Sequence, residues 1–256
     1  MPAPRPNAFR LSVMMFAACL AAMTALVALS PPGHAQSGPV VDNHTFDITL
    51  KGLRAATLSL AGQQSGATYS VTGKLESRGL AAMVRKVRYD ASVQGRTRGG
   101  KYTPAAYSER TDTGKRKSSS EMEYRRGVPQ PKRLDPPRDP RPDDLNPAKQ
   151  GGTVDPLTAL YATLRDVDAG QECKVALQMF DGRRRSQIAL SSRKADGDKV
   201  TCRGEYRRVA GFSAEDMAEK TRFPFVLTYA PTDQGRMRVV TVTTETLFGT
   251  ATLTRN

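Results

Sequence analysis

Residues 45–51, TFDITLK, decide the fold class of this chain. Phe46, Ile48 and Leu50 alternate with polar residues, which is the two-residue period of a strand with one buried face. The same period recurs at residues 58–60, 69–73, 87–93, 104–126, 175–190, 200–206, 223–229 and 237–253. Turn residues separate these runs, so the sequence predicts a mostly antiparallel all-β chain of about ten to twelve strands.

One helix stands out from this pattern at residues 155–165. Asp155 suits the N-cap and Pro156 the first helical position. The apolar positions that follow share one helical face: Leu157, Leu160, Tyr161 and Leu164. Shorter helical turns are predicted at 79–84 and 213–220. We therefore expect a curved sheet, a half-barrel or an open barrel, with one amphipathic helix packed across the sheet or plugging its mouth.

Residues 128–152 contain seven prolines interleaved with charged residues. Proline cannot donate to a sheet ladder or continue a helix, so this segment is predicted to be a proline-rich loop within a single domain, residues 36–256. A loop of this length is either functional or disordered. We expect disorder or weak tethering rather than a lid over a site.

The first 35 residues have the parts of a secretory signal peptide in the right order. Arg5 and Arg10 precede an apolar stretch at 11–29, and a Pro-Pro break and the small residue Ala35 follow. The stretch could instead stay as a membrane anchor, since a span needs about 20 apolar residues. The Pro-Pro break and Ala35 favour cleavage. We predict a periplasmic mature chain that begins near Gln36 and has no transmembrane segment.

Cys173 and Cys202 are the only cysteines that would remain after export. An oxidising compartment favours a disulfide between them. Closing this loop of about 30 residues would contribute about 3.6 kcal/mol to the free energy of unfolding. The alternative is two buried free thiols. No metal site is expected, because structural zinc takes four Cys or His ligands.

Basic residues outnumber acidic ones, 39 Lys and Arg against 25 Asp and Glu, and the net charge is +14. The candidate anion contacts follow two predicted turns: Lys115, Arg116, Lys117, Arg183, Arg184 and Arg185. Such clusters attract anionic partners. Outside the cytoplasm these are anionic lipids, lipopolysaccharide or cell-wall polymers, and nucleic acid is not expected. The simpler interpretation is a set of solvated strand ends that prevents edge pairing, and the sequence leaves both open.

Catalytic residues are harder to find. His44 is the single histidine of the predicted mature chain, and it is expected to be solvated in a polar lead-in before the first strand, so a Ser-His-Asp or Cys-His site is not expected. The acidic residues fall mainly in turns and helix caps, such as Asp155 and Asp181, where backbone hydrogen bonding explains them. We expect no catalytic residue and no cofactor. A carboxylate-based hydrolase is the remaining enzymatic alternative.

Five segments carry a resemblance to a known family: 68–73, 103–107, 154–161, 181–184 and 223–225. Over most of residues 45–253 the chain resembles the bacterial envelope family called domain of unknown function 3108. The resemblance implies a periplasmic protein with a largely antiparallel β fold. It carries over no activity and no ligand residues. The proline-rich insertion before Asp155 departs from the compact pattern of the family.

These observations favour a non-catalytic periplasmic protein. Its curled sheet would shelter a lipid-like ligand while basic strand ends contact anionic groups. The alternative is a structural interaction module whose interior is a packed core. A pocket lined by Leu, Val, Phe and Met would distinguish the first function from the second.

Overall fold

The computed structural model describes residues 39–246 and 249–256. The predicted signal peptide, residues 1–35, lies outside this part of the chain, so its cleavage stays a prediction. The all-β prediction is confirmed, because the described residues form fourteen strands, three short helices and one 3-10 turn. No helix of this part is long and apolar enough to cross a membrane.

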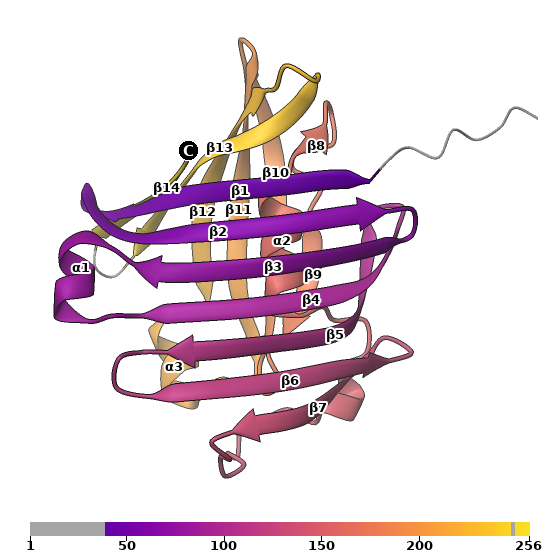
Figure 1. Cartoon of the computed structure of the whole chain (residues 1–256), viewed down its shortest axis with the longest axis vertical. Coiled ribbons are helices and arrows are strands. Elements are labelled where there is room, and N and C mark those ends of the chain that lie inside the picture. The colour runs from indigo at the N-terminus through magenta and orange to yellow at the C-terminus, as the bar shows by residue number, and fades with distance from the viewer. Residues whose placement is uncertain (1–38, 247–248) are drawn as a thin grey trace, which may run out of the picture. The chain divides into compact units, whose positions relative to one another are not determined.

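The N-terminal strands form one meander in which each strand pairs with the next (Figure 1). In β3, Tyr69 and Val71 are buried while Ser70 and Thr72 are exposed, as the two-residue period requires. Helix α1 (Gly79–Val84) connects β3 to β4, at the helical turn predicted from the sequence. The strands of this run are β1 (Val40–Leu50), β2 (Leu53–Ser65), β3 (Thr68–Ser77), β4 (Arg88–Arg98), β5 (Lys101–Asp112), β6 (Lys117–Arg125) and β7 (Val128–Asp135).

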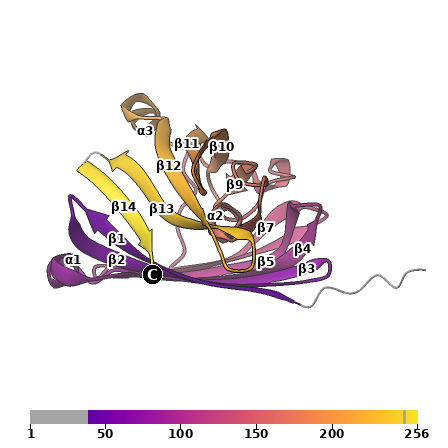
Figure 2. The same ribbon diagram turned by 90° about the horizontal axis from the view of Figure 1, so that it is seen from above.

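The C-terminal strands form a second meander, and β1 pairs with β14 to join the two runs into one sheet. The strands of the second run are β8 (Val167–Asp168), β9 (Ala176–Phe180), β10 (Arg185–Asp196), β11 (Lys199–Ala210), β12 (Arg222–Pro231), β13 (Arg236–Thr246) and β14 (Gly249–Arg255). The two-residue strand β8 pairs with β13. Helix α3 (Ala214–Glu219) follows β11, at the second short helical turn predicted from the sequence, and is capped by Ser213. In Figures 1 and 2 the second run crosses behind the first.

The sheet curls into a nearly closed barrel with one seam, where the edge strands β7 and β9 do not pair with each other. The chain between these edges fills the seam with backbone hydrogen bonds. Gly152 N donates to Gly127 O at 3.0 Å beside β7, and Val154 N donates to Gln178 O at 2.9 Å on β9. The 3-10 turn η1 (Pro147–Lys149) precedes both contacts in the chain and packs on β7.

Strand β7 replaces the first part of the loop that was expected over residues 128–152. Pro129 and Pro131 pair in register with Tyr124 and Met122 of β6. An edge strand has one side without a partner, so the missing N–H of proline is tolerated there. Pro129 and Gln150 are buried. Residues 128–135 of the proline-rich segment are therefore part of the barrel wall rather than of a weakly tethered loop.

Helix α2 (Pro156–Leu164) occupies the space inside the curl, between the two runs of strands (Figure 2). The Asp155 carboxylate accepts from Thr158 N at 2.8 Å, so the predicted N-cap is present. The helix packs on β3, β4 and β9. A Cβ on Gly62 of β2 would lie 2.3 Å from the ring of Tyr161, so the sheet approaches the helix closely only because glycine stands there.

Candidate functional site

A pocket of about 510 Å³ lies on the inner side of the sheet, beside the seam and the first residue of α2. Inward side chains of β4, β5 and β6 form its floor, namely Tyr89, Tyr107, Glu109 and Met122. Its walls are the segment after β7 and the turn between β9 and β10. Pockets at the mouths of barrels are frequent ligand sites. We call this feature the seam pocket.

Volume alone does not single out the seam pocket. Larger hollows lie elsewhere: one of about 820 Å³ lies beside α1, and two, of about 800 and 610 Å³, lie on the outer face of the N-terminal strands. The two on the outer face are lined mostly by short polar side chains, such as Ser70, Thr72 and Ser92. The seam pocket differs because five arginines converge on it: Arg133, Arg138, Arg141, Arg183 and Arg184. Its chemistry is therefore the more specific.

The turn between β9 and β10 places two of these arginines. Asp181 Oδ1 accepts from the backbone N–H groups of Arg183 and Arg184, at 2.9 and 2.7 Å. Gly182 at the centre of the turn has a φ of 100°, a conformation that favours glycine. The Arg183 carbonyl accepts from Leu145 N at 2.9 Å, which holds the turn against the seam segment.

The pocket is lined by as many carboxylates as guanidinium groups, so pairing rather than net charge decides what it can bind. Asp144 forms an ion pair with Arg183, in which Arg183 Nη2 lies 3.0 Å from Asp144 Oδ2. The Asp181 carboxylate accepts hydrogen bonds from the backbone of its own turn. Arg133 lies 3.8 Å from the exposed Asp135, outside the lining. Among the described residues these contacts leave three guanidinium groups of the lining without an ion pair, and they also leave the carboxylates of Glu109, Glu121 and Asp143 without one.

Arg138, Arg141 and Arg184 have no ion pair within the part of the chain that the structure describes. Arg184 stacks over the ring of Phe212, 5.1 Å from its centroid. Partial desolvation lowers the pKa of Arg138, and the positive charges of Arg116, Arg183 and Arg141 lower it further. Arg138 stays protonated at neutral pH, because guanidinium does not titrate in that range. An anion would supply the partner that these three groups lack.

The floor of the seam pocket presents a fixed carboxylate. Glu109 Oε2 accepts from Tyr107 Oη at 2.6 Å and also from Tyr89 Oη. Burial raises the pKa of both tyrosines, and the negative charge of Glu109 raises it further, so both are neutral donors. Glu109 Oε1 has no hydrogen bond in the described residues. It can accept one from a hydroxyl or ammonium group of a ligand.

The predicted anion contacts are divided by the structure. Arg183 and Arg184 line the seam pocket, and Arg116 lies near enough to affect the pKa of Arg138. Arg185 donates to Gln178 within the sheet and is not part of the lining. Lys115 and Lys117 line a different hollow beside α1.

Sequence reasoning missed Arg133, Arg138 and Arg141, which lie in the proline-rich segment that was expected to be a loop. The available signal was the density of arginine among those prolines. Nothing in the spacing shows that the segment closes the seam next to the turn at residues 181–184.

A group of buried ionisable side chains lies away from the seam pocket, where β1 meets the chain after α2. His44 is 3 % exposed, which corrects the expectation of a solvated side chain. Its Nε2 lies 3.8 Å from Asp42 Oδ1, and neither ring nitrogen has a hydrogen bond among the described residues. Tyr161 Oη donates to Asp42 Oδ2 at 2.6 Å, and Arg255 Nη1 lies 2.6 Å from Asp166 Oδ1.

These buried carboxylates already have structural partners. Asp42 and Asp166 each accept from side chains of neighbouring elements, and Asp155 caps α2. Among the described residues no group of three or more His, Cys, Asp or Glu side chains could hold a metal ion. We interpret this network as part of the core.

Cys173 and Cys202 form a disulfide, with their Cα atoms 5.4 Å apart. Cys202 lies on β11 as expected. Cys173 precedes β9 rather than lying within it, so the bond ties a connecting segment to the sheet. Strand β9 itself starts only at Ala176.

Comparisons with known proteins place the chain in a family. The chain is similar to a solved structure, a beta-barrel-like protein of domain of unknown function DUF1849 from Brucella abortus. The two share 12 % sequence identity, over 85 % of this chain and 96 % of that one, with a TM-score of 0.44. No curated protein matches it. The family model described as protein of unknown function DUF3108 matches residues 45–255, and the chain therefore belongs to the DUF3108 family.

Proposed function

We propose that this protein is a non-catalytic periplasmic binding protein whose ligand carries an anionic group and binds in the seam pocket. One observation carries the proposal: Arg138, Arg141 and Arg184 line one pocket, and none of them is ion-paired within the described residues. Phosphate and carboxylate groups match the planar fork of arginine and form charge-assisted hydrogen bonds with it.

The filled interior limits which part of a ligand is recognised. Tyr69, Tyr102 and Tyr161 pack edge to face between α2 and the sheet. A lipid-like ligand would therefore be held by its anionic head group at the seam rather than by acyl chains inside the curl. The same head group occurs on free phosphate esters, so the source of the ligand needs its own test.

Titration calorimetry with glycerol phosphate and with a short-chain phosphatidic acid tests the proposal. We expect both to bind if the head group suffices, and only the lipid to bind if the acyl chains contribute. Arg138→Ala/Arg141→Ala should weaken binding by at least about 100-fold, because each charge-assisted hydrogen bond contributes about 1.5–3 kcal/mol.

Arg110→Ala/Arg203→Ala is the matched control. Arg110 follows Glu109 on β5 but is exposed on the outer face, and Arg203 is exposed on β11. This pair should bind as the wild type does. Equal losses in the two double variants would show that only net charge matters, and the seam pocket would then not be the site.

The periplasmic location is tested separately. N-terminal sequencing of the protein from the periplasmic fraction should find an N-terminus at or near Gln36. Recovery of the intact N-terminal stretch in the membrane fraction would contradict export with cleavage.

A structural interaction module is the second candidate. It is favoured by one observation, that α2 and the tyrosines packed around it occupy the interior where a sheltered ligand was expected. Failure of both phosphate ligands to bind, together with no small molecule copurifying from the native periplasm by mass spectrometry, would support this candidate over the first.

A further inference from the structure

The most exposed apolar side chains of the described residues gather at one end of the N-terminal strands. Met83 and Val84, at the end of α1, are 81 % and 89 % exposed. Leu53, the first residue of β2 after the β1–β2 turn, is 61 % exposed. A single exposed apolar residue needs no explanation, but several on neighbouring turns indicate a contact surface.

Three connections meet at this end of the sheet. Arg78 N donates to Ala55 O at 2.8 Å, which fixes the start of α1 beside β2. A Cβ on Gly79 would lie 2.8 Å from Arg54 O, and one on Gly114 would lie 2.9 Å from Lys86 O. The β1–β2 turn, α1 and the β5–β6 turn are therefore neighbours, on the left of Figure 1. We call them the α1 corner (residues 51–54, 78–88 and 113–117).

The α1 corner is strongly basic. A hollow of about 820 Å³ beside α1 has two acidic residues in its lining, Glu76 and Asp112. The basic residues of the lining are Arg78, Arg85, Lys86, Arg88, Lys115 and Lys117. The carboxylates are already paired, Glu76 with Arg78 and Arg88, and Asp112 with Lys117.

The remaining cations have no such partner. Arg85, Lys86 and Lys115 are exposed and form no ion pair in the described part of the chain. They lie next to the apolar tip, because Arg85 and Lys86 follow Val84 directly, and Lys115 follows Gly114, whose backbone lies close to the Lys86 carbonyl. The corner therefore combines exposed apolar groups with positive charge that nothing in the fold neutralises.

We propose that the α1 corner docks the protein on an anionic lipid bilayer, with Met83 and Val84 among the head groups and Arg85, Lys86 and Lys115 against the lipid phosphates. A short helix with an apolar tip and flanking basic residues matches the polarity of a membrane interface. The tip protrudes, whereas a docking site for an apolar segment of another protein would be a groove. This surface does not include the seam pocket, so each can be tested without the other.

Cosedimentation of the full chain with vesicles tests the proposal. The vesicles contain either phosphatidylcholine alone or two parts phosphatidylcholine to one part phosphatidylglycerol. We expect binding only to the anionic vesicles, and we expect it to weaken as salt is raised. Arg85→Glu/Lys86→Glu should lower the partition coefficient by at least about 25-fold, since each basic residue near the surface contributes about fivefold.

The apolar tip has its own variant and control. Met83→Asp/Val84→Asp should lower partitioning by at least about tenfold, because both side chains must leave water for the interface. Val41→Asp is the control. Val41 is 60 % exposed, but it lies at the other end of β1 from the β1–β2 turn, so its replacement should leave partitioning unchanged.

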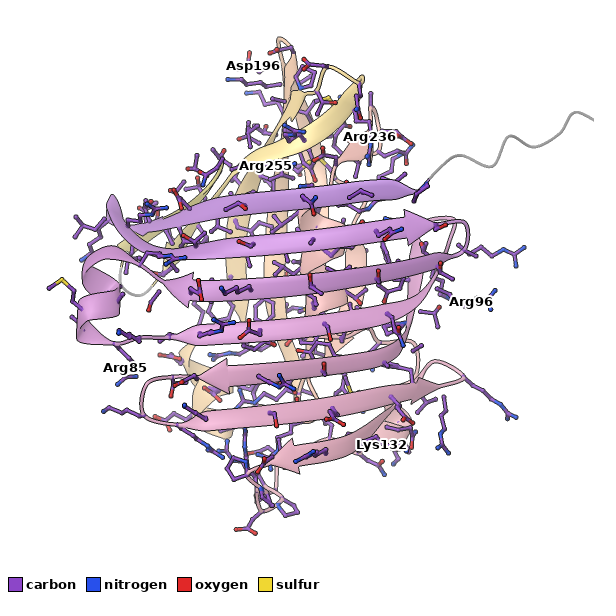
Figure 3. The ribbon with its side chains drawn as sticks, viewed as in Figure 1. Arg85, Arg96, Lys132, Asp196, Arg236 and Arg255 are labelled. Atoms are coloured by element: carbon purple, nitrogen blue, oxygen red, sulfur yellow. A yellow bond between two sulfur atoms is a disulfide. The ribbon has the colours of Figure 1, made fainter. Side chains whose placement is uncertain are left out.

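A charge control lies at the far end of the same strands. Arg96 and Arg98, in the last residues of β4, are exposed and form no ion pair in the described residues, and Figure 3 shows Arg85 and Arg96 on opposite sides. Arg96→Glu/Arg98→Glu should bind like the wild type. Equal losses in this variant and in Arg85→Glu/Lys86→Glu would overturn the proposal, because binding would then depend on net charge alone.

Hydrogen exchange of the wild type locates the contact without any variant. Where residues 11–29 are retained, they would bind neutral and anionic vesicles alike. The residues whose amides are protected from exchange therefore show which part of the chain contacts the vesicle. Anionic vesicles should slow amide exchange in residues 79–88. Protection confined to other residues, or equal protection of residues 79–88 by neutral vesicles, would overturn the proposal. Absence of vesicle binding would overturn it as well and would leave an acidic protein as the partner to seek.

Discussion

Gly62 shows how a single absent methyl group sets the distance between the sheet and α2. A Cβ at this position would lie 2.3 Å from the ring of Tyr161, which is fully buried and donates to Asp42. The ring has nowhere to move. We predict that Gly62→Ala lowers the free energy of unfolding by about 1–3 kcal/mol, the usual cost of overpacking, measured by denaturant melts.

Gly151→Ala is the matched control for Gly62→Ala. A Cβ at Gly151 would lie 3.5 Å from Val128 Cγ2, which is an ordinary van der Waals distance, and its φ is not positive. This variant should melt at or above the wild-type midpoint. If the two variants melt alike, the close approach of β2 to α2 is not rigid.

The burial of His44 follows from the two-residue alternation of β1 when that alternation is extended toward the N-terminus. The alternation that marks Phe46 and Ile48 as inward also places His44 and Asp42 on the inward face, and β1 indeed begins at Val40. Their polarity made them resemble a lead-in to the strand. The period was the better guide, because a buried network with Tyr161 and Arg236 holds Asp42.

The position of His44 predicts how stability depends on pH. Burial and the positive charge of Arg255 lower its pKa, which Asp166 and Asp42 raise by less. At pH values at which the unfolded histidine, with a pKa of 6.5, takes up a proton, His44 therefore stays neutral in the folded protein. Stability should fall as the pH drops below that value, by at most about 2 kcal/mol between about pH 7.5 and about pH 5.

The effect of His44 has to be separated from that of Asp155. Burial raises the pKa of Asp155 to about 6, so this carboxyl takes up its proton in the folded state first and stabilises the fold on acidification. Denaturant melts of His44→Leu at both pH values provide the comparison. The wild type should lose more stability than the variant on acidification, and equal losses would contradict the assignment.

At the scale of elements, the proline-rich segment divides into a strand and a linker. Replacing residues 128–135 by a flexible linker should lower the melting temperature strongly, because β7 and the buried Pro129 are lost. Shortening residues 136–143 alone should change stability by only about 1 kcal/mol, the order of loop-closure terms. Thermal melts of the two variants provide the test. The opposite order would mean that β7 contributes little to the wall.

The same segment explains why the seam pocket could be predicted only in part. The turn at Asp181–Gly182 is a local signal, and the basic residues after it were identified from the sequence. Arg138 joins them only because residues 136–155 close the seam between strands that lie far apart in the chain. No local period encodes that contact. The N-cap of α2 was predictable because Asp155 and Pro156 act within one turn of the helix.

At the scale of the whole molecule, the disulfide ties the segment before β9 to β11. Cys173→Ala/Cys202→Ala should lower the free energy of unfolding by about 3–4 kcal/mol, through the entropy that the unfolded chain regains. Denaturant melts measure the change. Thiol labelling of the unfolded, unreduced protein should find no free thiol other than Cys19. Two reactive sites at Cys173 and Cys202 would reject the bond in the native protein.

The barrel as a whole was predictable to the extent that its pairings are local. Most neighbouring strands are consecutive in the chain, so their alternation and the turns between them indicate hairpins directly. The pairing of β1 with β14 has no such signal, because Thr49 and Thr252 are 203 positions apart. The prediction of a curved or open barrel was therefore right in class, while its closure had to come from the structure.

The pairing of β1 with β14 also has a consequence for the order of folding. Each run of strands can assemble from short hairpins, whereas β1 must wait for a strand about 200 positions later, at a larger cost in loop entropy. Closure should thus follow the rate-limiting step. Leu253→Ala, in register with Ile48, should then speed unfolding and leave the refolding rate almost unchanged in stopped-flow experiments. Until the last strand is in place, the exposed edge of β1 is open to pairing with a second chain.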